Sequence, residues 1–232
     1  MHLRKYHGQG NDFLLLLDPN GKQPIDGPTA RAACDRHRGV GADGLIRITT
    51  DPLTMELYNA DGSRAETSGN GLRCVARAVV DALWQSDLSF TIATDAGPCR
   101  ATVHGDGTVS VGMGTATVQG EHVDLGNPHV VVLVDDLSDV DGSRDPDVNV
   151  EFVVPGPGPD ELTMRVFERG VGETQACGSG ACAAAAVAHA KGLVGDTVTV
   201  HQPGGAVTVA LGDPIVLTGP AAFICDVEWP WR

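Results

Sequence analysis

The sequence predicts an α+β protein built from two similar domains, each a mostly antiparallel sheet or barrel wrapped around a central helix. Two observations predict this class. Short stretches rich in β-branched and aromatic residues surround only three helix-like segments, 28–38, 69–84 and 178–191. The stretch 68–78 also repeats the pattern of the stretch that begins at Cys177, at an offset of nearly half the chain.

The expected strands follow one another with turn residues between them. In the first half they are FLLLLD (13–18), GLIRITT (44–50), TMELYNAD (54–61), SFTIAT (89–94), RATVHG (100–105) and TVSVGMG (108–114). In the second half they are HVVVLVDD (129–136), NVEFVV (149–154), ELTMRVFERG (161–170), DTVTVHQ (196–202), AVTVAL (206–211) and FICDVEW (223–229). Each half therefore combines a run of strands with one long helix.

The third helix is predicted to carry a reactive residue at its N-terminus. The stretch CGSGACAAAA (177–186) places a thiol and two glycines before a run of alanines, so the helix should begin at about Gly178 and leave Cys177 at its end. Unpaired N–H groups and the helix dipole favour thiolate there, so we expect Cys177 to have a lowered pKa and to be uncovered. Cys182, further inside the helix, is expected to be buried and structural.

The repeated stretch predicts a second helix N-terminus of the same kind. In SGNGLRCVARA (68–78), Ser68 has the place that Cys177 has in the other half. Two such N-termini that faced each other across a domain cleft would hold a carboxylate between converging N–H groups. Chance similarity of two Gly-rich helix starts is the alternative interpretation.

The charge and cysteine usage exclude several classes of protein. Thirty acidic against sixteen basic residues give a net charge of −14, which argues against binding nucleic acid or an anionic membrane through bulk electrostatics. The N-terminus lacks the apolar segment of a signal peptide, and no apolar run approaches the length of a membrane span, so we expect a cytoplasmic protein. The six cysteines form no CxxC pair and are expected to be reduced.

Neither a metal nor a cofactor is expected. The eight histidines lack ligand spacing, and no HExxH occurs. The stretch GVGADG (39–44) spells GxGxxG, but a helix-like segment precedes it and a strand-like segment follows it. Because a dinucleotide-binding unit has the reverse order, we expect an ordinary Gly-rich turn. None of the three lysines, Lys5, Lys22 and Lys191, has the setting of a Schiff-base lysine, which argues against a pyridoxal enzyme.

Several segments together resemble the diaminopimelate epimerase family. They are HGQGNDF (7–13), NADGSRAETSGNG (59–71), GNPH (126–129), NVEF (149–152), ERGVGETQACGSGACA (168–183) and LTGPA (217–221). The resemblance implies a pyridoxal-independent epimerase that converts LL- to meso-diaminopimelate, a precursor of lysine and peptidoglycan. One residue would remove the α-proton while another delivers a proton to the opposite face. Because that proton is very weakly acidic, two helix N-termini aimed at the α-carboxylate would be needed to stabilise the carbanion.

The resemblance also implies roles for single residues. Cys177 and Ser68 would be the catalytic pair, with Glu168 and His129 orienting or relaying protons. The substrate-binding set it implies is Asn11, Asn59, Gly69, Asn70, Asn127, Asn149, Glu168, Arg169, Gly178 and Ser179. Arg169 would be the bidentate partner of the distal carboxylate, while the glycines, Asn70 and Ser179 offer backbone N–H groups to the proximal one. For the asparagines, turn formation is the alternative.

Ser68 departs from the family pattern, which has Cys before Gly-Asn-Gly. A hydroxyl is far less acidic than a thiol, so a neutral Ser68 can deliver a proton but is a poor base. Three explanations stay open: an engineered substitution that traps ligand, a natural Ser/Cys epimerase with another or slower substrate, or a relative with a different reaction such as a racemase or a dehydratase. A protein that only binds the amino acid is the alternative from another class.

We expect the first domain to hold residues 1–113 with 218–232 and the second to hold 114–217, with the active site in the cleft between them. The expected partner is a small amino-acid substrate, with no nucleic acid and no membrane. The sequence does not determine the oligomeric state, and a homodimer is one expectation.

Overall fold

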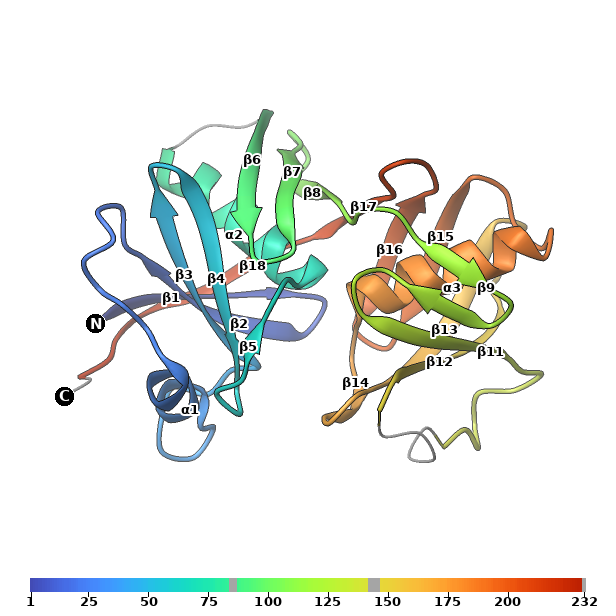
Figure 1. Ribbon diagram of the computed structural model, residues 1–232, viewed down its shortest axis with the longest axis horizontal. Coiled ribbons are helices and arrows are strands. Elements are labelled where there is room, and N and C mark those ends of the chain that lie inside the picture. Colours follow the sequence, from blue (N-terminus) through green and yellow to red (C-terminus); the bar gives the residue numbers. More distant parts are fainter. Residues whose placement is uncertain (84–86, 142–146, 231–232) are drawn as a thin grey trace. The chain divides into compact units, whose positions relative to one another are not determined.

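The computed structural model describes residues 1–83, 87–141 and 147–230. The chain divides into two compact units, Met1–Val111 with Pro220–Arg232, and Gly112–Gly219. In each unit strands surround one long helix, α2 (Gly69–Leu83) in the first and α3 (Gly178–Ala190) in the second (Figure 1). Among the described residues, no helix is long and apolar enough to cross a membrane.

The first unit is a curled sheet of mostly antiparallel strands. Its elements besides α2 are β1 (His2–Gly8), β2 (Asn11–Leu17), α1 (Gly27–Cys34), β3 (Gly44–Thr50), β4 (Leu53–Asn59), β5 (Arg64–Ala65), β6 (Leu88–Thr94), β7 (Gly97–Val103), β8 (Thr108–Gly112) and β18 (Ala222–Glu228). The strands pair in the order β18-β1-β2-β3-β4-β6-β7-β8, with β5 beside β4. The β2–β3 and β4–β6 pairs are parallel.

The second unit repeats this plan. Besides α3 it holds β9 (Thr117–Gln119), β10 (His122–Asp124), β11 (Pro128–Leu133), β12 (Asn149–Pro155), β13 (Glu161–Glu168), β14 (Gly172–Thr174), β15 (Thr197–Gln202), β16 (Gly205–Ala210) and β17 (Val216–Pro220). The order is β9-β10-β11-β12-β13-β15-β16-β17, with β14 beside β13 and with β11–β12 and β13–β15 parallel. The repeated stretches thus belong to a repeated topology.

The register of the parallel pairs makes the two units comparable residue by residue. Phe13 on β2 pairs with Gly44 on β3, and His129 on β11 pairs with Asn149 on β12. Two residues further along β3 and β12 lie Ile46 and Glu151, which therefore hold equivalent positions.

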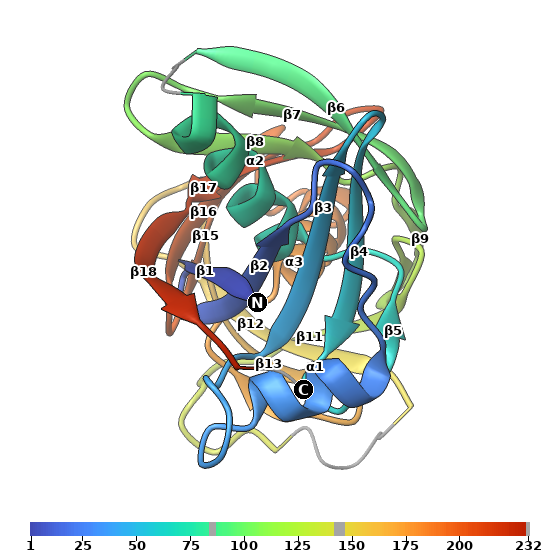
Figure 2. The same cartoon turned by 90° about the vertical axis from the view of Figure 1, so that its left-hand side faces the viewer.

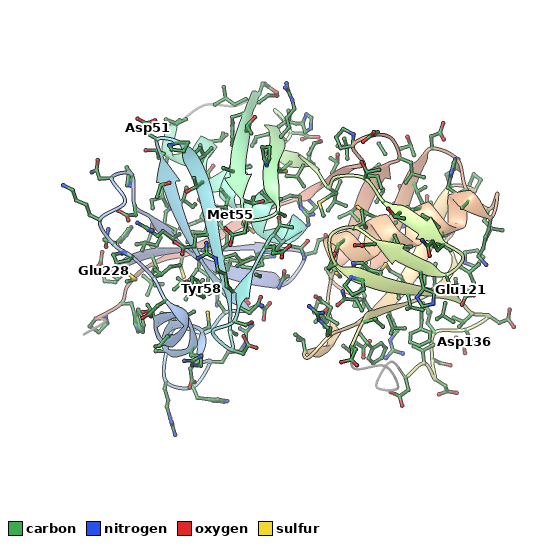
Figure 3. The ribbon with its side chains drawn as sticks, viewed as in Figure 1. Asp51, Met55, Tyr58, Glu121, Asp136 and Glu228 are labelled. Atoms are coloured by element: carbon green, nitrogen blue, oxygen red, sulfur yellow. The ribbon has the colours of Figure 1, made fainter. Side chains whose placement is uncertain are left out.

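The central helices fill the interior of their sheets. Helix α3 is apolar on every side, because a run of alanines, Ala183 to Ala186, is buried along it. Helix α2 contacts β1, β2 and β7, and Figure 2 shows it among these strands. On β4, Met55 is buried and its methyl group reaches the first turn of α2, whereas Tyr58 is partly exposed with Arg64 over its ring (both tyrosine and methionine are labelled in Figure 3).

The helix expected over 28–38 is shorter than predicted. Asp26 caps its N-terminus by accepting the N–H of Thr29 at 2.9 Å, but α1 ends at Cys34. The next residue, Asp35, is extended, and its carboxylate accepts the N–H groups of His37 and Arg38, which makes a turn in place of further helix. The prediction that 39–44 lies between a helix and a strand is confirmed.

Several strands were absent from the expected set: β1, β5, β9, β10, β14 and β17. In β1 the buried residues Leu3 and Tyr6 are three positions apart, because the register shifts between Lys5 and Tyr6, so the sequence shows no period of two. The others have two to five residues, too few for a clear period.

Candidate functional site

The two central helices begin with the same N-capping geometry. In the first unit the Ser68 hydroxyl accepts the N–H of Gly71 at 3.1 Å. In the second unit the Cys177 thiol accepts the N–H of Gly180 at 3.4 Å. Helix α3 begins at Gly178 with Cys177 as its N-cap, as predicted. Each unit therefore has a polar or nucleophilic side chain at a helix N-terminus, and this residue with its neighbours is called the half-site of that unit.

The half-site of the first unit is ordered by a chain of hydrogen bonds. Asn70, buried in the first turn of α2, donates to the Asn11 side-chain oxygen at 3.1 Å. Asn11 in turn donates to Asp43 at 2.8 Å, and Asp43 is paired with Arg36 at 2.7 Å. Because Asp43 only accepts, it fixes the orientation of the Asn11 amide. Gly69 is the buried first residue of the same helix.

Asn59 lies apart from this chain of hydrogen bonds. It is the exposed last residue of β4, and its amide donates to the Ser63 hydroxyl at 3.0 Å. This contact is the turn chemistry that the sequence offered as the alternative for asparagines. Since Asn59 pairs with Gly44, the register makes Asn59 the equivalent of Glu168, the last residue of β13.

The half-site of the second unit gathers residues from three strands and α3. Asn149 at the start of β12 accepts the backbone N–H of Arg169 at 3.0 Å and donates to the Pro128 carbonyl at 3.1 Å. Asn149 therefore fixes the backbone at Arg169, whose side chain is exposed. Asn127 donates to the Ser179 hydroxyl at 3.4 Å, next to the buried Gly178.

Two acidic side chains act on the thiol of Cys177. Glu168, partly exposed, accepts the Thr174 hydroxyl at 2.6 Å, and its charge raises the pKa of Cys177. The charge of Glu151 acts in the same direction.

The prediction that Cys177 is uncovered and has a lowered pKa is wrong. The residue is only 6% exposed, and burial raises its pKa well above the usual value of a thiol, with Glu168 and Glu151 adding to the rise. The hydrogen bonds from Ser179 and from the N–H of Gly180 lower the pKa, as expected of a helix N-terminus, but their effect is the smaller one. Cys182 is fully buried, as predicted.

His129 is buried, and its partner is a residue that the sequence interpretation missed. Its Nδ1 lies 2.7 Å from Oε1 of Glu151, and both side chains are fully buried. Burial raises the pKa of Glu151, with the contact to His129 opposing that rise. The sequence does indicate that Glu151 is buried. In NVEFVV, Glu151 is two residues from the inward-facing Val153 and next to the outward-facing Phe152, so its side chain points inward.

In the first unit the structure thus brings Asn11 and Asn70 together. In the second unit Asn149 is bonded to Arg169, and Ser179 contacts both Asn127 and Cys177. Within the ranges that the structure describes, no group of three or more His, Cys, Asp or Glu side chains has the arrangement of a metal site.

Comparison with known proteins identifies relatives along nearly the whole chain. The sequence model of the family described as "Diaminopimelate epimerase" matches residues 3–119 and 122–224. The diaminopimelate epimerase of Acidothermus cellulolyticus is 35% identical over 285 residues, covering 96% of this chain and 93% of the relative. That of Mycolicibacterium paratuberculosis is 37% identical over 284 residues, covering 98% of this chain and 96% of the relative.

Solved structures share the fold at much lower identity. A phenazine biosynthesis protein of the PhzF family from Bacillus anthracis has a TM-score of 0.79 at 15% identity, covering 98% of both chains. A hydroxyproline epimerase from Agrobacterium vitis has a TM-score of 0.72 at 16% identity, covering 98% of this chain and 91% of that one. These likenesses confirm the predicted fold class, and the fold is shared by proteins with different names.

Proposed function

Because this chain belongs to the diaminopimelate epimerase family, we propose that it is a cofactor-independent isomerase that epimerises diaminopimelate between its LL and meso forms, with Ser68 in place of one catalytic Cys. The observation that carries this proposal is the equivalence of Ser68 and Cys177. Each caps the central helix of its unit through the N–H group three residues later. A reaction that inverts one carbon needs two such groups, one for each face of the substrate.

The two helix N-termini supply the electrostatic part of the mechanism. Both carry N–H groups at the positive end of a helix dipole, at Gly69 and Asn70 in α2 and at Gly178 and Ser179 in α3. We propose that both half-sites act on one substrate molecule and that these groups bind its α-carboxylate. Negative charge that develops on this carboxylate when the α-proton leaves is then stabilised.

Cys177 is the proposed base, and the bound substrate must activate it. Burial and the charge of Glu168 both raise the pKa of Cys177 and so favour the neutral thiol. The α-ammonium group of a substrate beside Glu168 would neutralise that charge and remove one of the two acidic influences on the thiol. Thiolate would then form in the complex, when a substrate proton is within reach.

Ser68 is the proposed proton donor on the opposite face. Its hydroxyl is neutral near pH 7, so it can protonate a carbanion but abstracts a proton slowly. We therefore expect unequal rates of α-hydrogen exchange for the two stereoisomers. The stereoisomer whose α-hydrogen faces Cys177 exchanges it faster than the one whose α-hydrogen faces Ser68.

The distal end of the substrate is assigned to Arg169. Its guanidinium is exposed, and Asn149 fixes its backbone. A second carboxylate, which diaminopimelate has and lysine lacks, suits a bidentate contact with this group.

Proton NMR in heavy water tests the proposal. The protein is incubated with LL- or meso-diaminopimelate, and loss of the α-hydrogen signal is followed together with the ratio of the two stereoisomers. We expect exchange with both isomers, faster with one of them, and none with Cys177→Ala from the Cys177 face. Binding without exchange would identify an amino-acid-binding protein, and a dehydrated product would identify a lyase.

A further inference from the structure

The buried pair of His129 and Glu151 has no counterpart in the first unit. The equivalent positions there are Phe13 and Ile46, which are also buried. Since the same topology forms around an apolar pair in one unit, the fold does not need an ionisable pair at this place. Burying ionisable side chains is costly, so the second unit carries the pair for another reason.

The carboxyl group of Glu151 lies against the first turn of α3. An ideal Cβ placed on Gly180 would be 2.7 Å from Oε1 of Glu151 and 3.2 Å from its Cδ and Cγ, so only glycine admits the carboxyl here. The N–H of Gly180 is also the group that donates to the thiol of Cys177. Gly180 therefore lies between the two groups: it is next to the carboxyl of Glu151, and its N–H is bonded to the thiol of Cys177.

Only one polar side-chain atom of each residue in this pair has a hydrogen-bond partner among the described residues. Nδ1 of His129 and Oε1 of Glu151 bond to each other, but Nε2 of His129 and Oε2 of Glu151 have no hydrogen-bond partner within the part of the chain that the structure describes. A pair that served packing alone would have its remaining polar atoms bonded, because each orphaned buried group costs about 1–3 kcal/mol. Such buried groups without a partner call for an explanation other than packing, and a role in the chemistry of the adjoining helix N-terminus is one.

The charge of this pair and the charge of the thiol are linked. Burial raises the pKa of Glu151, and ionised Glu151 raises the pKa of Cys177. The other titratable groups on α3 and on the strands packed against it include Cys182, which is buried, Glu168 and Arg165 on β13, which are partly exposed, and His189 on α3 with His122 and Asp124 on β10, which are exposed. His201 on β15 is paired with Glu161 on β13, and both are about one-third exposed.

We propose that Glu151 is a positioning residue for proton transfer at Cys177: it fixes the imidazole of His129 and places its own carboxyl group against Gly180, the residue whose N–H donates to the thiol. This inference rests on the proposed function, which makes Cys177 the base. Ionised Glu151 opposes the thiolate, so Glu151 also holds the thiol in its resting, protonated form.

The test compares Glu151→Gln with the matched variant Glu161→Gln. Glu161 belongs to a second His–Glu pair of the same unit, but that pair is about one-third exposed and joins β13 to β15. Alkylation of Cys177 by iodoacetamide is followed peptide by peptide between pH 7 and 10, with the partly exposed Cys225 as internal control. We expect Cys177 to react about three- to tenfold faster at a fixed pH in Glu151→Gln, which corresponds to up to one unit of pKa. Glu161→Gln should react like the wild type.

A second readout needs no change at Glu151. In protein with ¹⁵N-labelled histidine, the ring nitrogen shifts of His129 report which nitrogen carries the proton. We expect these shifts to change when Cys177 is alkylated, and to show an altered tautomer in Glu151→Gln. Unchanged alkylation rates together with unchanged shifts would overturn the inference. Loss of α-hydrogen exchange in the wild type would instead refute the proposed function, because neither readout here requires turnover.

Discussion

The carboxyl of Glu151 occupies the space that a side chain on Gly180 would need, with Oε1 only 2.7 Å from the ideal Cβ position. An ideal Cβ on Gly71, at the equivalent place in α2, would be 3.1 Å from the end carbons of Ile46 and Met55 and 3.2 Å from Cβ of Ser68. The two glycines thus lie in the first turns of equivalent helices but differ in the atoms that leave no room for a side chain.

Gly180→Ala should therefore damage the protein more than Gly71→Ala. A methyl group added at position 180 would displace a buried, hydrogen-bonded carboxyl, whereas flexible side-chain ends can retreat from a methyl group at position 71. Overpacking of this kind costs about 1–3 kcal/mol. We expect the larger drop in melting temperature, and the larger loss of α-hydrogen exchange, in Gly180→Ala. Equal losses in both variants would contradict the special role of the Glu151 contact.

Ser68→Cys should make the reaction faster and more symmetric. A thiol at the N-terminus of α2 can act as a base, which a neutral hydroxyl does poorly. We expect epimerisation to rise by at least about tenfold, a modest general-base effect. Deuterium incorporation with each stereoisomer measures the change, and Ser68→Ala is the control that should lose proton delivery on that face. Fast, symmetric exchange in the wild type would mean that Ser68 is already a fully activated base.

Much of the position of these groups follows from the sequence. Alanine and glycine preferences place the start of α3 at Gly178, and the repeated pattern places the start of α2 at Gly69, as the structure has them. Both are local properties, so a short window of sequence determines them.

The chemistry of Cys177 could not be predicted in this way. Its pKa depends on burial and on Glu168 and Glu151, which reach it from two strands that precede the helix in the chain. The residues next to Cys177 in the sequence indicate only the effect of the helix dipole. Glu151 escaped notice for the same reason, since alternation shows that its side chain points inward but not that α3 and His129 lie there.

Alkaline pH should destabilise the protein through its buried thiols. Burial raises the pKa of Cys34 and Cys74 to about 12 and that of Cys177 well above its usual value. A folded-state pKa above the unfolded value of about 8.5 means that the unfolded chain releases protons first. This stability is complete below about pH 8.5 and is lost as the pH rises, by up to about 1.4 kcal/mol per unit for each thiol. Urea unfolding between pH 7 and 10 should show a shallower decline in Cys177→Ser than in the wild type; identical slopes would contradict the buried thiol.

Arg169→Ala should weaken binding of diaminopimelate without lowering stability. The side chain is exposed, and the contact that orders the local backbone is the N–H of residue 169 to Asn149, which the substitution keeps. Loss of a charge-paired partner should cost about 2–5 kcal/mol in affinity. Calorimetry with diaminopimelate and with lysine measures the difference: the variant should bind both about equally, whereas the wild type prefers diaminopimelate. Arg165→Ala, which removes the pair between Arg165 on β13 and Glu173 on β14, should leave that preference intact.

Replacing the buried pair by its counterparts from the first unit separates stability from activity. The double variant His129→Phe/Glu151→Ile gives the second unit the apolar residues that Phe13 and Ile46 supply in the first. Apolar residues of similar volume are often neutral or stabilising by about 1–4 kcal/mol in place of a buried ionic pair. We therefore expect an unchanged or higher melting temperature, together with a loss of α-hydrogen exchange from the Cys177 face. The single variant Glu151→Ile would instead leave the imidazole of His129 buried without its partner, and should melt at a lower temperature than the double variant. If the double variant instead unfolds more easily than Glu151→Ile, the pair is a packing element of the second unit. Replacing both residues would then cost more free energy of unfolding than replacing Glu151 alone.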